Sequence, residues 1–509
     1  MKAITVIFVL ILPCLLFSNM IVAFSVDLDN NAFHEYKKNV DMVSTEEIVD
    51  SGMWLFETID MSGDVGFYSS IAVDSDDMPS IAYYDRQYTN LNVISKKDEN
   101  WVRYTVDDSG DVGRYASLAF DNQGCMHIAY YDASFNDLKY ARQMEDGWDI
   151  QTLDSKGVVG LDCSLALDKD DHPHISFFDD TNQVLKYITF YDDQWATEIV
   201  DDTIGSGHGS SIALSDSGGV FISYSNSNDE YLYCASRIGS GWSVDCVDDK
   251  SSVFASTAID TDSFGNPHIC YFDVPSTTDD WSLKYATCIN GVWSLEIIDP
   301  EVQYFWNDWG CSICVDQFDR LHIGYYKWMN WDLQYALNDG NGWIIESVDT
   351  DGSVGAFADI DVTSTGYPQI SYVDLNNMAL KHAVKVQFAP QRPIPPVGQN
   401  IGFKGTVYEY RIVSSDFDGD QIRYYIDWGD DSPFEITELY PSDVEVVVSH
   451  SWGSTGSYSI RLKAFDSNGF ESPWSEPKSV VMPKCFLDVL WYPLNFLRGS
   501  PLYSTFLFL

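Results

Sequence analysis

The hydrophobic positions of this chain follow a short rhythm in which apolar, aromatic or β-branched runs alternate with turn residues. A representative stretch is WVRYTVDDSGDVGRYASLAFDNQGCMHIAYYDASFNDLKYAR at 101–142, where Gly, Asp, Asn and Ser separate four such runs. Runs of this composition between polar turn residues are typical of strands, and the stretch has no helical period. It therefore predicts four short strands joined by turns.

This four-strand unit recurs along most of the chain. Its marker is a tryptophan at positions 54, 101, 148, 195, 242, 293 and 343, in steps of 47, 47, 47, 47, 51 and 50 residues. Units of about 40–50 residues with four strands each are typical of β-propeller blades. The first strands of seven units begin near Ser69, Ala116, Cys163, Ser210, Thr257, Cys311 and Ala358.

The seventh unit lacks its own tryptophan strand, whereas the chain begins with a spare one, WLFETID at Trp54–Asp60. Pairing this strand into the last blade would satisfy two open sheet edges. The sequence therefore predicts an all-β protein with a seven-bladed propeller over residues 50–386, closed by an N-terminal strand.

The repeat ends after Lys385. A Pro-rich segment at 387–399 reads as a linker, and residues 400–483 contain DWGDDS and HSWGSTGSYSIRLKAFDSNG. The run YSIRLKAF alternates like a half-buried strand, and DSNG is a turn. These features predict a second, β-sandwich domain.

One stretch of the repeat, DKDDHPHISFFDD at 168–180, resembles a metal site when it is read alone. His174 nevertheless aligns with His127, His268 and His322 in other blades, and Asp168 aligns with further aspartates. A feature present in most blades maintains the blade rather than forming one site. The aspartates that end the tryptophan strands receive the same structural interpretation, as acceptors for turn N–H groups.

The charge balance narrows the range of partners. Acidic residues number 77 and basic residues 29, so the formal charge is −48. Such a surface repels phosphate backbones and anionic lipids, which argues against nucleic-acid binding. It suits divalent cations, high salt or high solubility.

Both chain ends are apolar. Residues 1–25 follow a secretory signal pattern, with an uncleaved anchor as the alternative, and 26–49 form a segment before the propeller. The tail at 484–509 is apolar but is interrupted by Pro493, Arg498 and Pro501. We expect an extracellular or cell-surface protein, with membrane association only through the N-terminal segment or the tail.

Two resemblances support this organisation. GNPHICYFD at Gly265–Asp273 and DLKYA at Asp137–Ala141 resemble the blade repeats of secreted prokaryotic propellers, archaeal ones among them. Residues 400–483 resemble a PKD domain, an immunoglobulin-like sandwich, but carry Asp431 where the family usually has glycine. The PKD resemblance implies spacing or adhesion at cell surfaces. The units are only loosely similar to sialidase propellers, and the absent Asp-box argues against sialidase activity.

Departures from the repeat identify a candidate ligand site in blades five and six, where the units are longer and rich in aromatic residues. The turns before and within these blades open on one face of a four-stranded blade. An exposed aromatic patch there would suit sugars or peptides; alternatively, the rings pack among themselves. The predicted ligand-binding residues are Trp281, Tyr304, Trp306, Trp309, Lys327, Trp328 and Trp331.

Other candidate chemistry is sparse. Asp416, Asp418 and Asp420 in DFDGD could bind calcium, or could only form a turn, and no other cofactor is expected. Cys234 and Cys246 flank a hairpin turn in blade four, so a disulfide is a hypothesis if they lie directly opposite one another.

The sequence favours a secreted or surface-attached binding or adhesion protein. The propeller would recognise an extracellular carbohydrate or protein, and the PKD-like domain would act as a spacer. A glycan-active hydrolase or lyase is the first alternative, although no pair of catalytic carboxylates can be chosen among so many aspartates. A structural envelope component is the second. Enzymatic activity is therefore left open, with a non-catalytic role preferred.

Overall fold

A computed structural model describes residues 52–98, 100–237, 239, 241–253, 257–274, 281–302 and 310–484 of the chain. Regular structure in these residues consists of strands. None of the described segments forms a helix long and apolar enough to cross a membrane. The predicted signal peptide at 1–25, the segment 26–49 and residues 485–509 of the tail lie outside the described residues.

Strands β1 to β28 form seven four-stranded antiparallel sheets in the described part of the chain, as the repeat predicts. We number these sheets as blades 1 to 7. Blades 1 to 3 comprise β2 (Val65–Val73), β3 (Pro79–Asp85), β4 (Asn90–Lys97), β5 (Asn100–Asp107); β6 (Val112–Phe120), β7 (Met126–Asp132), β8 (Asp137–Met144), β9 (Gly147–Asp154); and β10 (Val159–Leu167), β11 (Pro173–Asp179), β12 (Val184–Tyr191), β13 (Gln194–Asp201).

The other four blades have the same plan, and the last includes the first strand of the chain. They comprise β14 (Ser206–Leu214), β15 (Val220–Asn226), β16 (Leu232–Arg237), β17 (Ser243–Asp248); β18 (Thr257–Thr261), β19 (Pro267–Asp273), β20 (Ser282–Ile289), β21 (Val292–Asp299); β22 (Cys311–Val315), β23 (Leu321–Lys327), β24 (Asp332–Asn338), β25 (Trp343–Asp349); and β26 (Val354–Val362), β27 (Pro368–Asp374), β28 (Ala379–Val386), β1 (Met53–Asp60).

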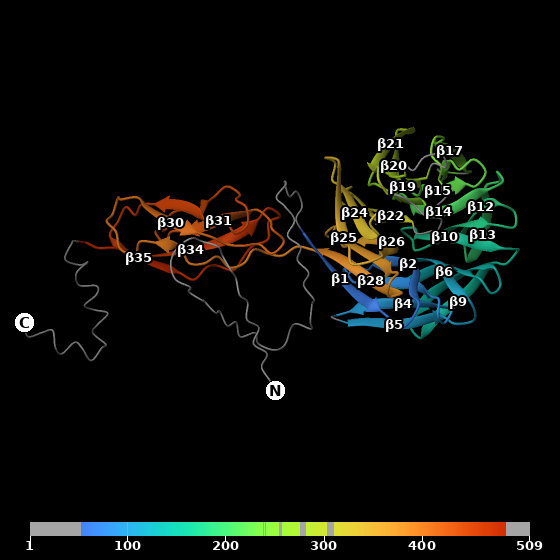
Figure 1. Cartoon of the computed structure of the whole chain (residues 1–509), viewed down its shortest axis with the longest axis horizontal. Helices are drawn as coiled ribbons and strands as arrows, with labels where there is room; N and C mark the ends of the chain where they lie inside the picture. The colour runs from blue at the N-terminus through green and yellow to red at the C-terminus, as the bar shows by residue number, and fades with distance from the viewer. Residues whose placement is uncertain are drawn as a thin grey trace, which may run out of the picture. The chain divides into compact units, whose positions relative to one another are not determined.

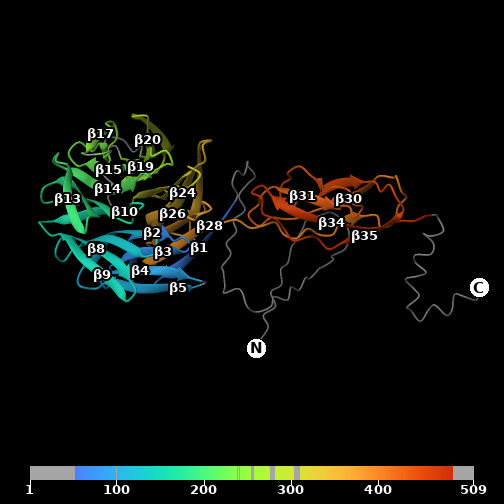
Figure 2. The same ribbon diagram turned by 180° about the vertical axis from the view of Figure 1, so that it is seen from behind.

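The position of a strand within its blade determines its residue pattern. Second strands such as β3 are buried along their whole length, because neighbouring blades cover both faces. Fourth strands such as β5 lie on the perimeter and are largely exposed (Figure 2). This difference explains why PSIAYYD is almost wholly apolar or aromatic, whereas NWVRYTVD mixes polar and apolar residues.

The N-terminal strand β1 pairs with β28, so one blade contains strands from both ends of the repeat region (Figure 1). The indole Nε1 of Trp54 donates a hydrogen bond to Glu346 at 2.9 Å. The ring of Trp54 packs edge-on against Tyr335, with centroids 5.1 Å apart. The spare strand therefore occupies the predicted place in the seventh sheet.

First strands of adjacent blades are linked by hydrogen bonds from backbone to side chain. Ser70 Oγ in blade 1 accepts the N–H of Leu118 in blade 2 at 3.1 Å. Asp359 in blade 7 accepts the N–H of Ile71 in blade 1 at 2.8 Å. A first strand has no further strand beside it, so a side-chain acceptor satisfies an otherwise unpaired N–H group.

A second link joins each fourth strand to the following blade. The aspartate that ends the strand accepts the N–H two residues further on through Oδ1, which confirms the predicted turn role. Asp107 Oδ2 also accepts the hydroxyl of Tyr130 at 2.6 Å and the ammonium of Lys139 at 2.5 Å, both in the next blade. The seven aspartates are Asp60, Asp107, Asp154, Asp201, Asp248, Asp299 and Asp349.

The C-terminal region forms two further sheets, in the orders β29-β30-β33 and β32-β31-β34-β35. Its core includes Trp452 and Trp428, whose rings meet edge to face with centroids 6.0 Å apart. The strands are β29 (Val397–Gly398), β30 (Tyr408–Ile412), β31 (Ile422–Asp427), β32 (Glu435–Ile436), β33 (Val446–His450), β34 (Gly456–Asp466) and β35 (Lys478–Met482).

The backbone conformation of Asp431 explains why this position accepts aspartate where the family usually has glycine. Its φ is 61°, in the left-handed region that glycine enters without steric cost. Aspartate is among the few other residues that tolerate this conformation. The substitution is therefore compatible with the turn after β31.

Removal of Trp54–Asp60 should strongly destabilise the propeller. The deletion takes away the partner of β28, the Trp54 contacts and one aspartate link, so we expect the melting temperature to fall by roughly 10 °C or more. Circular dichroism of the full chain and the deletion variant measures this. Deletion of residues 30–36, which is equally long, is the control. Equal melting temperatures for the parent and the strand deletion would contradict the pairing.

Candidate functional site

The first strands of all seven blades surround a pocket of about 250 Å³ on the propeller axis. Each strand contributes consecutive residues to its wall, such as Tyr68–Ser70 from β2 and Phe357–Asp359 from β26. Short first-strand segments from all seven blades can meet only at the axis of the ring. The pocket is therefore a product of the ring and not of any single blade.

One side of the pocket is aromatic. The ring centroid of Tyr68 lies 4.7 Å from that of Tyr115 and 5.1 Å from that of Phe357. All three rings are half-buried and belong to blades 1, 2 and 7. Adjacent blades thus place three rings in one continuous wall.

The backbone under this wall is unusual. Tyr68, Tyr115, Asp162 and Phe357 occupy the same position in their blades, and their φ values are 52°, 54°, 50° and 55°. Neighbouring blades fix these residues, because Ser69 Oγ donates to the Phe357 carbonyl at 2.9 Å. Non-glycine residues held in this region mark functional sites more often than random positions.

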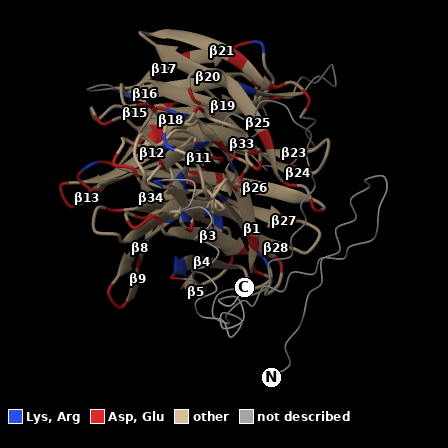
Figure 3. Cartoon of the chain, turned by 90° about the vertical axis from the view of Figure 1, so that its left-hand side faces the viewer, with Lys and Arg blue, Asp and Glu red and all other residues tan. Residues whose placement is uncertain are grey.

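Polar side chains also line the pocket, beside the aromatic wall. Asp162 and Asp359 line it together with His208, and Asp162 accepts the N–H of Gly209 at 2.9 Å. Burial raises the pKa of Asp359. Lys and Arg are absent from the described residues that line the pocket, and acidic positions outnumber basic ones over the described ribbon (Figure 3).

At one first-strand position, blades 5 and 7 carry an aspartate where blades 1 to 4 have alanine. Asp260 accepts the N–H of Val315 at 2.7 Å, and Asp361 accepts that of Val73 at 2.7 Å. Burial raises the pKa of Asp260 to about 6 and that of Asp361 to about 7. Blades 5 and 7 therefore carry acids that exchange protons near neutral pH.

The predicted aromatic patch is only partly described. Tyr304, Trp306 and Trp309 lie outside the described residues. Trp281 and Trp328 both pack on one core cluster of blades 5 and 6, and Trp328 meets Trp331 with centroids 6.2 Å apart. Trp331 is 52% exposed. Trp281 and Trp328 therefore pack internally, as the alternative prediction stated. Of these three tryptophans, only Trp331 has a large exposed face.

Lys327 has a structural role in this fold. Its ammonium group donates to Asp299 Oδ2 at 2.7 Å, so it completes the link between the fourth strand of blade 5 and blade 6. Burial opposes ionisation of Asp299, but hydrogen bonds led by that from Lys327 lower its pKa. The charge of Lys327 is thus already paired, which disfavours the predicted ligand contact.

The repeated histidines also serve the blades. His127 lies between Asp121, at 3.2 Å from Nε2, and the hydroxyl of Tyr140, at 2.5 Å from Nδ1. Burial lowers the pKa of His127, so the ring is neutral near pH 7. Equivalent contacts to Asp and Tyr are made by His174, His268 and His322.

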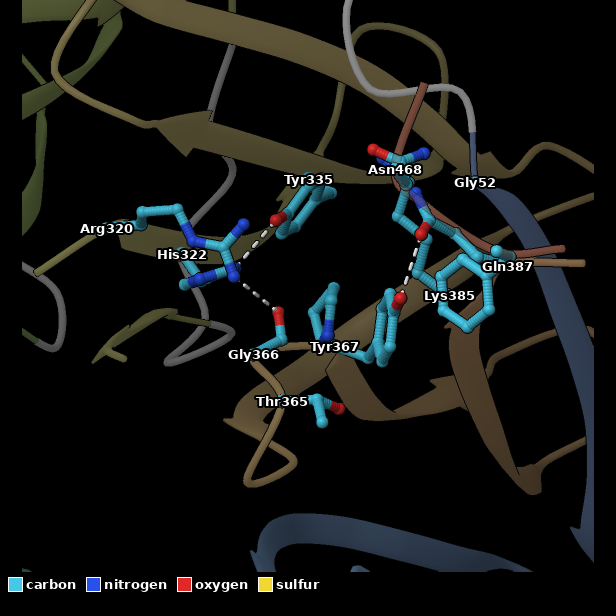
Figure 4. A pocket seen from close by; sticks show the side chains of 12 residues that line it. Gly52, Arg320, His322, Tyr335, Thr365, Gly366, Tyr367, Lys385, Gln387 and Asn468 are labelled. Atoms are coloured by element: carbon cyan, nitrogen blue, oxygen red, sulfur yellow. Dashed lines mark hydrogen bonds between the residues drawn. The ribbon is translucent and has the colours of Figure 1, made fainter. Parts of the chain in front are cut away.

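A second hollow, of about 300 Å³, includes turn residues of blades 6 and 7 (Figure 4). Here the Arg320 guanidinium donates to Asp316 at 2.6 Å and to the Gly366 carbonyl at 3.3 Å. Tyr367 donates its hydroxyl to Gln387 at 2.8 Å. These polar groups bind one another, which makes this hollow a weaker candidate than the axial pocket.

The predicted calcium residues do lie together. Ligand atoms of Asp416, Asp418 and Asp420 lie within 4.8 Å of one another. Asp416 Oδ2 and Asp466 Oδ2 are buried without a hydrogen-bond partner. Burial, with repulsion from Asp418, raises the pKa of Asp420 to about 6. Asp466, at the end of β34, lies outside this convergent group, but its charge also raises the pKa of Asp420.

The two cysteines of the disulfide hypothesis in blade 4 do not lie directly opposite one another. In the ladder Cys234 lies opposite Asp245, and Cys246 lies opposite Tyr233. The offset of one residue places the two side chains on opposite faces, so that Cys234 is buried and Cys246 exposed. Both are free thiols.

The axial pocket was missed by the sequence analysis, which looked for departures in loops. Its trace was nevertheless present in the first strands. The position of Tyr68 varies among aromatic residues, aspartate, serine and glycine, whereas the next two positions remain mostly small. A variable column beside a uniform one distinguishes ligand-facing residues from packing residues.

Comparisons with known proteins match both parts of the chain. A PKD domain family model matches residues 385–476. The PKD domain of a peptidase from a Thermoplasmatales archaeon is 40% identical, over 19% of this chain and 100% of that domain, with a TM-score of 0.19. No curated protein sequence matches the chain.

Enzymes with similar structures cover the propeller at low identity. A Hadza microbial sialidase is 12% identical and covers 60% of this chain and 73% of its own, with a TM-score of 0.41. A polysaccharide lyase is 9% identical and covers 62% and 89%, with a TM-score of 0.42.

Proposed function

Residues 385–476 belong to the PKD domain family, and we propose that the chain is an extracellular protein whose propeller binds a carbohydrate. In this proposal the PKD domain holds the propeller away from its attachment point. PKD domains are typical of extracellular proteins, which supports the location. The binding or adhesion role is supported by the chemistry of the axial pocket.

The aromatic wall of the pocket carries the proposal. Tyr68, Tyr115 and Phe357 present half-buried ring surfaces beside the carboxyl groups of Asp162 and Asp359. Sugar rings stack their C–H faces on aromatic rings and donate hydroxyl hydrogen bonds to carboxylates. The pocket therefore combines the two contacts that a carbohydrate uses.

The charge of the pocket selects among carbohydrates. Asp162 and Asp359 would repel a sugar carboxylate or sulfate, and no Lys or Arg of the described lining offsets them. We therefore assign the pocket to a neutral oligosaccharide. Trp331 is exposed on blade 6 and remains a separate candidate contact, outside the lining of the axial pocket.

Hydrolysis is the second candidate function. Glycoside hydrolysis uses two carboxyl groups, one of them protonated as an acid. Burial raises the pKa of Asp359, and Asp162 lines the same pocket, but the oxygens of Asp359 already accept the N–H of Ile71 and the hydroxyl of Ser312, which makes hydrolysis the weaker candidate. Turnover of a bound oligosaccharide would distinguish an enzyme from a binding protein.

Replacement of Tyr68 and Tyr115 by glycine should remove carbohydrate binding while preserving the fold. Gly209 holds the same position in blade 4 with a φ of 57°, so the change relieves φ strain and removes two rings. Truncation of aromatic anchors often costs ~2 kcal/mol, which is roughly thirtyfold in affinity. A glycan array of neutral and anionic oligosaccharides, followed by calorimetry on the best neutral ligand, measures the effect.

Tyr88→Ser, an exposed tyrosine of blade 1, is the control, and Trp331→Ala tests the patch separately. Equal affinity of the parent and the double glycine variant would refute the pocket, as would preference for anionic glycans. Release of reducing sugar from the bound oligosaccharide by the parent chain would instead establish the hydrolase alternative.

We also propose that calcium binds the aspartates of the C-terminal domain. Asp416 is 7% exposed and Asp466 is 2% exposed, yet each has an oxygen without a hydrogen-bond partner. A buried carboxylate oxygen without a partner is costly, and calcium accepts six to eight such oxygens. Burial, with repulsion from Asp418 and Asp466, raises the pKa of Asp420, and a bound cation would offset that repulsion.

Calcium binding should depend on pH in a defined direction. Since the folded pKa of Asp420 is raised to about 6, its contribution to stability is lost as pH rises through 6 in the absence of metal. We expect calcium to raise the melting temperature of the full chain at pH 7.5 and to bind roughly tenfold or more weakly at pH 5.5.

Calorimetric titration of the full chain with calcium measures the affinity. Asp466→Asn keeps an oxygen for the N–H groups of Asn468 and Phe470 but removes the charge, so it should weaken binding. Asp146→Asn, in the exposed turn between β8 and β9, is the matched control. Equal titration curves for the parent and Asp466→Asn would contradict this site.

A further inference from the structure

A repeated contact joins the second strand of one blade to the first strand of the next. Small side chains meet there, and in three places their hydroxyl groups lie within hydrogen-bond distance. The three contacts are Ser176–Ser210 at 3.1 Å, Ser223–Thr257 at 2.7 Å and Ser371–Ser69 at 3.2 Å. The ring therefore brings these two side chains together whichever small residues occupy the positions.

Between blades 5 and 6 the same two positions hold cysteines. Cys270 pairs with Ala258 in its sheet, and Cys311 pairs with Tyr325 in the next. The two Sγ atoms lie 3.1 Å apart, and both side chains are buried. This cysteine pair is distinct from the cysteines of blade 4 and was not identified from the sequence.

This interface also differs from the others in its backbone links. Ser211 Oγ accepts the N–H of Ile259, and Ser312 Oγ accepts that of Ile360, as the repeat requires. The equivalent position in blade 5, between these two blades, is Ala258, whose side chain has no hydrogen-bond acceptor. Blades 5 and 6 thus lack one repeated hydrogen bond where the two sulfur atoms meet.

We propose that Cys270 and Cys311 form a disulfide bond that cross-links blades 5 and 6. The two S–H bonds break and one S–S bond forms, while two electrons and two protons pass to a disulfide oxidant, which leaves as two thiols. A disulfide needs an S–S distance of about 2.05 Å, so the sulfur atoms approach by about 1 Å. The oxidising location rests on the proposed extracellular function, whereas carbohydrate binding is not required.

The burial of both sulfur atoms determines when the bond forms. Thiol–disulfide exchange needs a thiolate and access to the oxidant. Burial, together with the neighbouring Cys311 thiol, raises the pKa of Cys270 well above its usual value once the blades have packed. Exchange therefore takes place during folding, and the finished bond is shielded from reductants.

Peptide mapping of the full chain tests the proposal directly. The chain is refolded with glutathione and glutathione disulfide, then denatured, alkylated without reduction and digested with trypsin. We expect peptide 251–284 to be joined to peptide 285–320 through Cys270 and Cys311. Fragmentation separates Cys311 from Cys288 and Cys314, which lie on the same peptide.

Cys163 is the internal control. It occupies the position of Cys311 in blade 3, but the facing residue of blade 2 is Ala129, so it should be alkylated. Alkylation of Cys270 and Cys311 after refolding and denaturation without reduction would overturn the proposal, as would linkage of either one to a different cysteine. This result does not depend on any carbohydrate ligand.

The double variant Cys270→Ser with Cys311→Ser restores the hydroxyl pair of other blades and should fold. We expect its melting temperature to be about 5 °C below that of the oxidised parent and equal to that of the parent folded in reductant. Cys163→Ser should leave the melting temperature unchanged. A double variant as stable as the oxidised parent would contradict a cross-link. If the double variant fails to fold, peptide mapping of the parent decides.

Discussion

The structure depends on how the innermost strand of each blade satisfies its free edge. That strand has a neighbour on one side only, and the ring supplies the missing acceptors from the adjacent blade. Ser70 accepts the N–H of Leu118, and Asp359 accepts that of Ile71 between the last blade and the first. Aspartates such as Asp107 add a second link farther out. Each blade therefore completes the hydrogen bonding of its neighbour.

These links are repetitive, so residues that differ between blades are free to serve a ligand. The aromatic wall of Tyr68, Tyr115 and Phe357 stands at one repeated position, and the hydroxyl and backbone contacts beneath it are common to several blades. The repeat fixes the backbone in a conformation that side chains rarely adopt. It then allows the side chain itself to vary, which is how a structural ring acquires a binding pocket.

The sequence predicted the blades well because strand and turn residues that are close together in the chain define each blade. The 47-residue steps, the spare strand at Trp54 and the turn aspartates all follow from residue type and spacing. The axial pocket depends on the meeting of residues that lie far apart in the chain, and only a comparison of the repeats at one first-strand position points to it. For the same reason the sequence could not show that Lys327 pairs with Asp299, which lies in another blade. It also could not show which residue lies opposite Cys234, because a bulge shifts the register of the two strands.

Hydrogen–deuterium exchange of the full chain, with and without the neutral oligosaccharide selected by the array, tests the axial pocket most directly. The account predicts slower exchange in peptides that cover residues 65–73, 112–120 and 354–362, since these first strands carry the aromatic wall. Protection confined to the turn at 168–180 or to the domain at 400–483, with the three first strands unchanged, would contradict it.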